Sequence, residues 1–190
     1  MGRWEPNTRQ RLELAALELF AERGYESTTV AEITERAGVT KRTFFRYFAD
    51  KREVLFSGQE ALSQLFTDAI EGAPESATPI EVMAAGLDAV SVLFPPERLE
   101  LVRRRQAIIA ANTDLQEREL LKLATVTTVM AAALGERGLP GPVARLTAEV
   151  GSLAFTTGFA RWIAPDNNRP YAELAREALE ELRVASAALS

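Results

Sequence analysis

The chain has 190 residues, is 47% hydrophobic and carries a net charge of −5, which suffices for a buried core in one large or two small domains. It contains neither cysteine nor histidine, which excludes disulfides, thiol redox chemistry, the usual zinc sites and every catalytic mechanism that uses a histidine base. Apolar residues recur at helical spacing and no alternating run of β-branched residues occurs, which predicts an all-α protein. We expect no metal site and no cofactor. We also expect a soluble cytoplasmic protein with no membrane partner, because no uncharged apolar stretch approaches about 20 residues.

The first predicted helix starts near Asn7 or Thr8 and runs to Arg23. Its apolar residues lie at i, i+3, i+4, i+7 and i+8, which describes one buried stripe; they are Leu12, Ala15, Ala16, Leu19 and Phe20. Gly24 ends this helix, because glycine adopts the left-handed conformation at little cost.

Two short helices joined by a glycine turn follow between Thr29 and Lys51. Thr29 and Glu32 have the spacing of a capping box at the start of the first one, and Gly38 ends it. Thr40 is a good N-cap for a second helix from Lys41 to Phe48. Phe44 and Phe48 are four residues apart and face inward, whereas Lys41, Arg42 and Thr43 face outward at the N-terminal end, where a recognition helix meets base edges.

The charge of this segment differs from that of the rest of the chain. Between Gly38 and Arg52 the charged residues are Lys41, Arg42, Arg46, Lys51 and Arg52 against Asp50 alone. A local basic surface on an acidic protein favours specific DNA contact over indiscriminate binding to polyanions. A merely solvated charged helix face is the alternative, and the capped helix-turn-helix pattern disfavours it.

The segment from Arg9 to Lys51 resembles the N-terminal DNA-binding domain of the tetracycline-repressor (TetR) family of bacterial transcription regulators. The resemblance rests on Arg9 to Gly24, Tyr25, Thr28 to Val30, Ala37 to Lys41, Thr43, Phe48 and Asp50 to Lys51. Three positions depart from the family pattern: Thr34 replaces a common alanine, Arg42 replaces a common glycine, and Phe45 replaces a tyrosine whose hydroxyl usually contacts phosphate.

The resemblance implies a three-helix helix-turn-helix domain over residues 1–50 and a larger effector-binding and dimerisation domain over residues 51–190, with about nine helices in all. It implies that Lys41, Arg42 and Thr43 read bases. Thr40, Tyr47 and Lys51 hold phosphates in this interpretation, and Thr29 and Phe45 complete the DNA-binding surface.

The remaining helices follow from breakers and caps. Asp50 and Glu53 form a further capping-box pattern, which predicts a connecting helix from Lys51 to Glu71, and Gly72 to Ser76 is a linker. Five more helices are predicted: Pro79 to Phe94, Glu97 to Asn112, Asp114 to Gly135, Pro142 to Ile163, and Tyr171 to Leu189.

Six residues of the C-terminal region are candidate effector contacts: Arg105, Gln106, Thr127, Thr128, Phe155 and Phe159. Arg105 lies on an apolar face, where it pairs with an internal acid, reaches the surface or meets an anionic ligand group. Gln106 is more often a satisfied core amide, and the two threonines commonly bond back to their own helix. Phe155 and Phe159 could wall a pocket, although aromatic stripes are more often core.

A stripe of small residues, Gly151, Ala154 and Gly158, permits another helix to approach closely. It suits either a dimer seam, which we favour because the last helix also has a broad apolar face, or tight packing inside the subunit. The predicted seam uses Pro142 to Ile163 and Tyr171 to Leu189.

The sequence thus predicts a homodimeric transcription regulator and not an enzyme. We expect a repressor that binds a pseudo-palindromic double-stranded DNA operator and is released by a small-molecule effector through a tilt of the 51–71 helix. The alternative function is a helical protein-interaction module that does not bind DNA.

Overall fold

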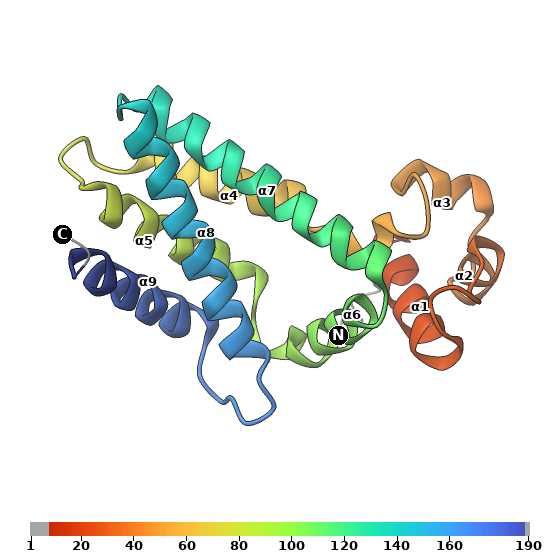
Figure 1. Ribbon diagram of the computed structural model, residues 1–190. Helices are drawn as coiled ribbons and strands as arrows, with labels where there is room; N and C mark the ends of the chain where they lie inside the picture. The colour runs from red at the N-terminus through yellow and green to blue at the C-terminus, as the bar shows by residue number, and fades with distance from the viewer. Residues whose placement is uncertain (1–7, 189–190) are drawn as a thin grey trace, which may run out of the picture. The chain divides into compact units, whose positions relative to one another are not determined.

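The structure, a computed structural model, describes residues 8–188, and within this range it is helical without strands (Figure 1). Nine α-helices are present in the described range: α1 (Thr8–Arg23), α2 (Val30–Arg36), α3 (Lys41–Tyr47), α4 (Gln59–Gly72), α5 (Pro79–Val90), α6 (Leu99–Ala110), α7 (Thr113–Glu136), α8 (Gly141–Ile163) and α9 (Tyr171–Ala187). Three short 3-10 segments separate some of them, namely η1 (Glu53–Phe56), η2 (Ser91–Leu93) and η3 (Pro96–Arg98). The predicted all-α class with about nine helices is confirmed.

The chain divides into two compact units that do not follow simple sequence order. Unit 1 combines residues up to Ser57 with Leu101–Glu119, and unit 2 combines Gly58–Glu100 with Leu120–Ser190. The α6–α7 corner therefore folds with the N-terminal helices. The functional division at residues 50 and 51 stays a prediction, and the packing shows that the N-terminal unit recruits a segment from much later in the chain.

Unit 1 has one apolar core shared by α1, α2, α3, η1 and the α6–α7 corner. Ile33, Phe44 and Leu12 are fully buried in it, and Ile109 and Leu115 from the α6–α7 corner join the same cluster. Two predicted helix ends are visible in the backbone, because Gly24 and Gly38 have φ of +86° and +65°. Neither turn is easily made by another residue type.

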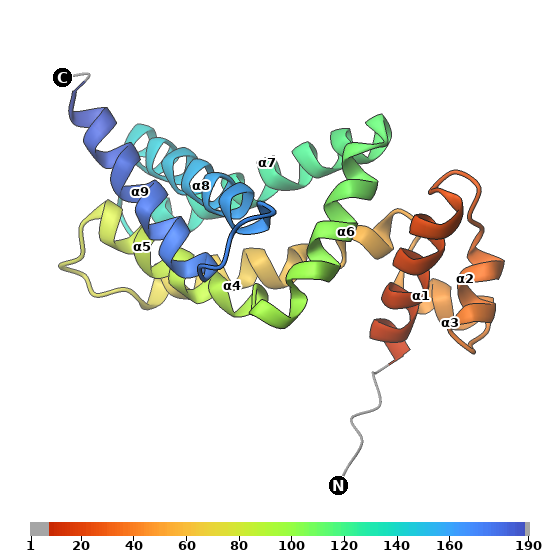
Figure 2. The ribbon, with the colours of Figure 1, turned by 90° about the horizontal axis from the view of Figure 1, so that it is seen from below.

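Unit 2 is built around α8, which packs along α9 and α5, while α5 also packs against α4 (Figures 1 and 2). Its core includes Phe66, Met83, Leu87, Met130 and Trp162, each almost completely buried. Arg137 ties the end of α7 to the end of α4, because its guanidinium donates to the carbonyls of Ile70, Ala73 and Pro74.

The predicted continuous helix from Lys51 to Glu71 is wrong. The segment forms η1 and then α4, with Ser57 and Gly58 between them, and unit 1 ends at this break. Asp50 does cap this segment, since its carboxylate accepts from the backbone N–H groups of Arg52 and Glu53. However, the cap starts a single 3-10 turn, and no side chain caps α4 after it.

The small-residue stripe of α8 packs inside the subunit, which corrects our preference for a dimer seam at these residues. A Cβ atom added at Gly158 would lie 2.6 Å from the Cα of Ala175 in α9, and one added at Gly151 would lie 2.5 Å from the Sδ of Met83 in α5. Ala154 is fully buried. The small side chains are explained by the close approach of two helices of the same chain.

No single helix in the described range is long and apolar enough to cross a membrane. Only Pro79–Leu93 and Pro96–Ala110 taken together, with a bend of 60° between them, meet the requirement by length and composition.

Candidate nucleic-acid interface and effector-site residues

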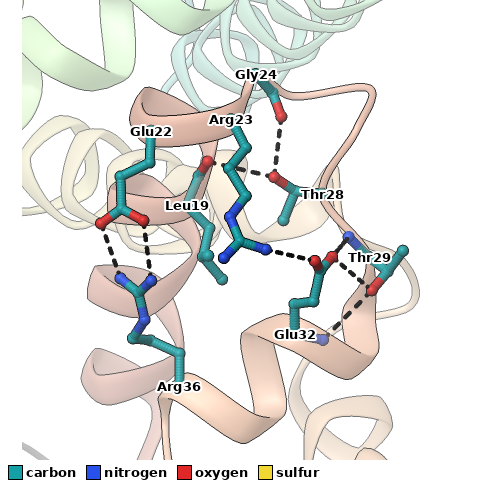
Figure 3. A network of polar contacts seen from close by, with 8 residues as sticks. All are labelled: Leu19, Glu22, Arg23, Gly24, Thr28, Thr29, Glu32 and Arg36. Atoms are coloured by element: carbon teal, nitrogen blue, oxygen red, sulfur yellow. Dashed lines mark hydrogen bonds and ion pairs between the residues drawn. The ribbon is translucent and has the colours of Figure 1, made fainter.

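A polar network fixes α2 on α1 (Figure 3). Thr29 and Glu32 form the predicted capping box, with the Glu32 carboxylate accepting from the Thr29 backbone N–H at 2.8 Å. Arg23 at the end of α1 donates to the same carboxylate at 2.7 Å, and these hydrogen bonds from Thr29 and Arg23 lower the pKa of Glu32. The hydroxyl of Thr29 thus serves the start of α2 and is engaged in the network.

A second contact between α1 and α2 was missed by sequence reasoning. The Arg36 guanidinium binds Glu22 through two hydrogen bonds of 3.0 and 2.9 Å, and it also reaches Glu18. The hydrogen bond from Arg36 lowers the pKa of Glu22. Glu18 and Glu22 are four residues apart on the exposed face of α1, and this i, i+4 spacing was the available signal.

Helix α3 begins as predicted at the Thr40 N-cap. The Thr40 hydroxyl accepts from the backbone N–H of Thr43 at 3.2 Å, and the two hydroxyl groups lie 3.0 Å apart. Phe44 and Phe48 are buried on the inner side. The first turn of α3 is therefore rigidly held, which orients the side chains that follow the cap.

The outer face of α3 presents charged and aromatic side chains to solvent. Lys41 and Arg42 are exposed, and neither side chain has a partner within residues 8–188. Phe45 is 56% exposed although it is aromatic. The Arg46 guanidinium lies over the Tyr47 ring and donates to its hydroxyl at 3.0 Å, so the Tyr47 hydroxyl keeps its own proton for another acceptor.

Lys51 has a structural position instead of an open one. Its Nζ donates to the carbonyls of Tyr25, Glu26 and Thr28 at 2.8, 3.2 and 3.1 Å and lies 4.3 Å from the centroid of the Tyr25 ring. An ammonium group has three donors, and all three are used here. Lys51 therefore ties the α1–α2 turn to the segment after α3, and its phosphate contact stays a prediction.

Arg105 and Gln106 lie in unit 1, where they share one carboxylate. Arg105 donates to Glu119 at 3.0 Å and Gln106 donates to the other oxygen of Glu119 at 3.1 Å. The Arg105 Nε also donates to the Leu55 carbonyl at 2.5 Å, and its guanidinium lies over the ring of Phe56. Of the three alternatives left open by the sequence, internal pairing is the one that the structure contains.

A second ion pair joins the same two segments. Arg118 of α7 donates twice to Glu53 of η1, at 3.1 and 2.8 Å. We call Arg105, Arg118, Glu53 and Glu119 the η1 clamp, because they hold η1 against the α6–α7 corner. The partners are separated by up to 65 residues, so no local sequence signal identifies them.

The other four effector candidates lie in unit 2, so the six residues do not form one site within either unit. Thr127 and Thr128 bond back to the carbonyls of Leu123 and Ala124, and the Thr127 hydroxyl also bonds to Ser152 at 2.9 Å. Thr128 is exposed. These contacts are the local bonding that the sequence left as an alternative to cavity lining.

Phe155 and Phe159 contact several further aromatic rings. Their own rings are stacked with centroids 6.3 Å apart, Phe94, Trp162 and Tyr171 lie around them, and Phe66 of α4 contacts Phe155 with centroids 6.1 Å apart. We call Phe94, Phe155, Phe159, Trp162 and Tyr171 the aromatic cluster. Sequence analysis missed Phe94 and Tyr171 as members, because one follows the 3-10 segment after α5 and the other begins α9.

The helix-turn-helix arrangement with an exposed basic first turn defines the class of DNA-binding regulators, and comparisons with known proteins agree. Residues 14–57 match the family described as bacterial regulatory proteins, tetR family. Over these residues the chain is similar to this family. Within residues 8–188 no group of three or more acidic, cysteine or histidine side chains could hold a metal ion.

Individual relatives show how far the similarity extends. The transcriptional regulator TcmR of Streptomyces glaucescens is 43% identical over 83 residues, which cover 44% of this chain and 37% of the relative. The fatty acid metabolism regulator protein of Bacillus subtilis is 31% identical over 112 residues, or 57% of each protein. The repressor FadR of Thermus thermophilus, solved with lauroyl-CoA, is 25% identical, with 92% of this chain and 93% of that chain covered and a TM-score of 0.54.

The chain thus spans between about a third and somewhat more than half of the length of these two curated relatives. Both are regulators, and the similarity over nearly the whole fold comes from the solved structure.

Proposed function

We propose that this protein is a DNA-binding transcription regulator. It acts as a repressor that leaves its operator when a small molecule binds. The observation that carries the proposal is the outer face of α3, where Lys41 and Arg42 are exposed and unpartnered beside a capped first turn. Such a surface has the donors that bind guanine O6 and N7 in the major groove. A regulator of this kind works in the cytoplasm, where chromosomal DNA lies.

The proposed contacts follow from the exposed groups. Lys41 and Arg42 read bases, with Thr43 beside them. Tyr47 donates its hydroxyl to phosphate, and Phe45 contributes apolar contact with a sugar or a thymine methyl group. Thr29 and Thr40 act through the backbone at the starts of α2 and α3, since helix N-termini bind phosphate well.

We propose further that the protein acts as a homodimer on a pseudo-palindromic operator, because a single short recognition helix makes few base contacts. The supporting surface consists of large exposed apolar side chains on α8 and α9. Val143, Leu146 and Leu153 of α8 are 42%, 66% and 51% exposed, and Val184 of α9 is 56% exposed. A patch of large exposed apolar side chains is typical of an interface.

The proposed effector is a hydrophobic or aromatic molecule that binds in unit 2. An acyl-CoA is a second candidate, because the Thermus thermophilus relative was solved with lauroyl-CoA. A ligand weakens DNA binding only when its affinity differs between the DNA-bound and released forms, and the coupling is reciprocal.

The decisive experiment is selection of the preferred sequence from random duplex DNA, followed by titration of the selected duplex at several salt concentrations. We expect a palindromic site, affinity that falls steeply with salt, and loss of about 1–3 kcal/mol at one base position for Arg42→Ala. Arg46→Ala is the matched control, because Arg46 is also exposed on α3 but is engaged with Tyr47.

Absence of any duplex binding would favour the alternative, a helical protein-interaction module whose basic helix meets an acidic partner. Sedimentation equilibrium of Leu146→Glu, beside the wild type, tests the dimer: we expect a dimer for the wild type and a monomer for the variant. A wild-type monomer at micromolar concentration on a site without symmetry would refute the proposed assembly.

A further inference from the structure

One polar group in the core of unit 2 has no partner. Tyr171 is only 1% exposed, and its buried hydroxyl makes no hydrogen bond within the described part of the chain. Buried hydroxyl groups are nearly always hydrogen-bonded, and leaving one unpaired costs stability. A phenylalanine would fill the same space without this cost, so the hydroxyl points to an acceptor that comes from outside the chain.

The surroundings of Tyr171 are aromatic, and one ring contacts all the others. The Phe94 centroid lies 4.6 Å from that of Tyr171, 5.4 Å from Trp162, 5.7 Å from Phe159 and 5.9 Å from Phe155. The other four residues are carried by α8 and α9, which are locked together where Gly158 meets Ala175. Four rings are therefore fixed by helix packing, and Phe94 occupies the place between them.

Phe94 differs from the other four rings of the cluster in its backbone. It follows η2 in an irregular conformation, with φ of −121° and ψ of 50°, and precedes Pro95. Its only backbone hydrogen bond in this turn runs from its N–H to the Ser91 carbonyl at 2.9 Å, and its side chain is partly exposed. The Phe94 ring is thus the member of the aromatic cluster that can leave without breaking a helix.

We infer that the aromatic cluster is the effector site, and that its ligand is a neutral apolar or aromatic molecule with one hydrogen-bond acceptor, such as a carbonyl oxygen. The ligand displaces the Phe94 ring and accepts the hydrogen bond of the Tyr171 hydroxyl. This inference rests on the proposed function as an effector-controlled regulator and specifies the chemistry of the effector.

The charges around the cluster favour a neutral ligand. Burial raises the pKa of Tyr171, so its hydroxyl stays a donor over the physiological range. Three arginines of α8, α9 and the loop between them are already paired: Arg161 with Glu181, Arg169 with Glu173 and Glu177, and Arg176 with Asp88. These three cations are therefore engaged and do not compensate an anionic group among the rings, whose loss of hydration is costly.

The position of Phe94 in the chain provides a route for the response. Five residues after Phe94 the chain enters α6, and α6 from Leu101 onward belongs to unit 1. Displacement of Phe94 moves the segment that leads into this helix. The ligand thereby acts on the unit that carries α3 through the chain itself.

The test uses the whole 190-residue chain and three naphthalene probes of nearly equal size: 2-acetylnaphthalene, 2-ethylnaphthalene and 2-naphthoate. Isothermal titration calorimetry of the wild type should show the ketone binding five- to tenfold more tightly than the hydrocarbon, and the carboxylate more weakly than both. Tyr171→Phe should abolish the preference for the ketone and leave the affinity for the hydrocarbon unchanged. Tyr25→Phe removes the hydroxyl of the buried tyrosine in unit 1 and should change neither affinity.

Displacement of Phe94 is measured separately by ¹⁹F NMR with 4-fluorophenylalanine at position 94, and at the buried position 20 of unit 1 as a control. Saturating ketone should shift the resonance at 94 and leave that at 20 nearly in place. Circular dichroism confirms that every variant keeps its helical content.

The inference is overturned if none of the probes binds the wild type, if ketone and hydrocarbon bind alike, or if the resonance at position 94 does not respond. Equal binding of both would mean that a trapped water already satisfies the Tyr171 hydroxyl. Because these measurements contain no DNA, their failure leaves the operator experiment untouched. A failed operator selection with intact ketone binding refutes the regulator and not the ligand site.

Discussion

The contact between α8 and α9 at Gly158 offers a quantitative test of the fold of unit 2. A methyl group at this position would lie 2.6 Å from the Cα of Ala175 and 2.9 Å from its Cβ, whereas carbon atoms pack comfortably at about 3.5–4.0 Å. The obstacle is backbone, so it cannot rotate away, and the two helices must separate by about 1 Å. Overpacking of this kind costs about 1–3 kcal/mol, and we expect the upper part of that range for a backbone contact.

A second glycine in unit 2 isolates the steric term. Gly135 lies in α7 with nothing within 4 Å of an added Cβ. Glycine-to-alanine substitution within a helix stabilises it by up to about 1 kcal/mol, and both variants gain this amount. Gly158→Ala should therefore be about 2–3 kcal/mol less stable than Gly135→Ala, and Gly135→Ala should exceed the wild type slightly.

Urea denaturation followed by the fluorescence of Trp162 measures this difference, because that side chain is buried beside the contact. Trp4, the other tryptophan of the chain, is replaced by phenylalanine in all proteins compared. The slope of the transition must be unchanged for the free energies to be comparable. Equal stability of the two variants would show that α8 and α9 do not approach at Gly158 and would refute the reasoning.

Three further predictions concern unit 1. Lys51→Met keeps the aliphatic stem but deletes three hydrogen bonds, so urea denaturation should show a free energy of unfolding lower by about 1.5–3 kcal/mol. If instead stability is kept and only the slope of DNA affinity against salt concentration flattens by about 1, Lys51 is a phosphate contact. Burial raises the pKa of Tyr25 to about 12 from its ordinary value of 10.0. Because the tyrosine of the unfolded chain ionises first, the contribution of Tyr25 to stability is intact below pH 10 and is lost between pH 10 and 12. In Tyr25→Phe this alkaline loss of stability should shrink, and an unchanged dependence of stability on pH would contradict the assignment. Arg105→Met and Glu119→Gln should each destabilise the protein, with a coupling energy of about 1–3 kcal/mol in the double-mutant cycle. Neither variant should change the affinity for 2-acetylnaphthalene. If the two losses of stability simply add in the double variant, the two side chains do not interact.

Lys51 illustrates why individual contacts transferred by resemblance are less secure than the fold that carries them. The position after α3 holds a basic residue in the family pattern, and the pattern is present here. Whether an ammonium group at this position faces phosphate or protein carbonyls depends on how the α1–α2 turn is folded beside it. In this chain three carbonyls of that turn point at the Nζ atom.

The elements of the fold could be predicted from the sequence because their determinants are local. The capping box of Thr29 and Glu32, the N-cap at Thr40 and the glycine at position 38 each involve groups within four residues of one another. Backbone geometry brings such groups together whenever the helix forms. The helix-turn-helix unit and the exposure of Lys41 and Arg42 followed from these local rules and from helical periodicity.

The contacts that decide the roles of individual residues involve segments far apart in the chain, and only the tertiary structure determined them. Arg105 contacts Leu55 across 50 residues, Phe94 meets Tyr171, and Gly158 approaches Ala175. Sequence periodicity states that a face is apolar or small but not which surface covers it, because many packings bury the same stripe. An arginine on an apolar face therefore had three possible fates in the sequence, and the side-chain geometry around Glu119 selected one of them.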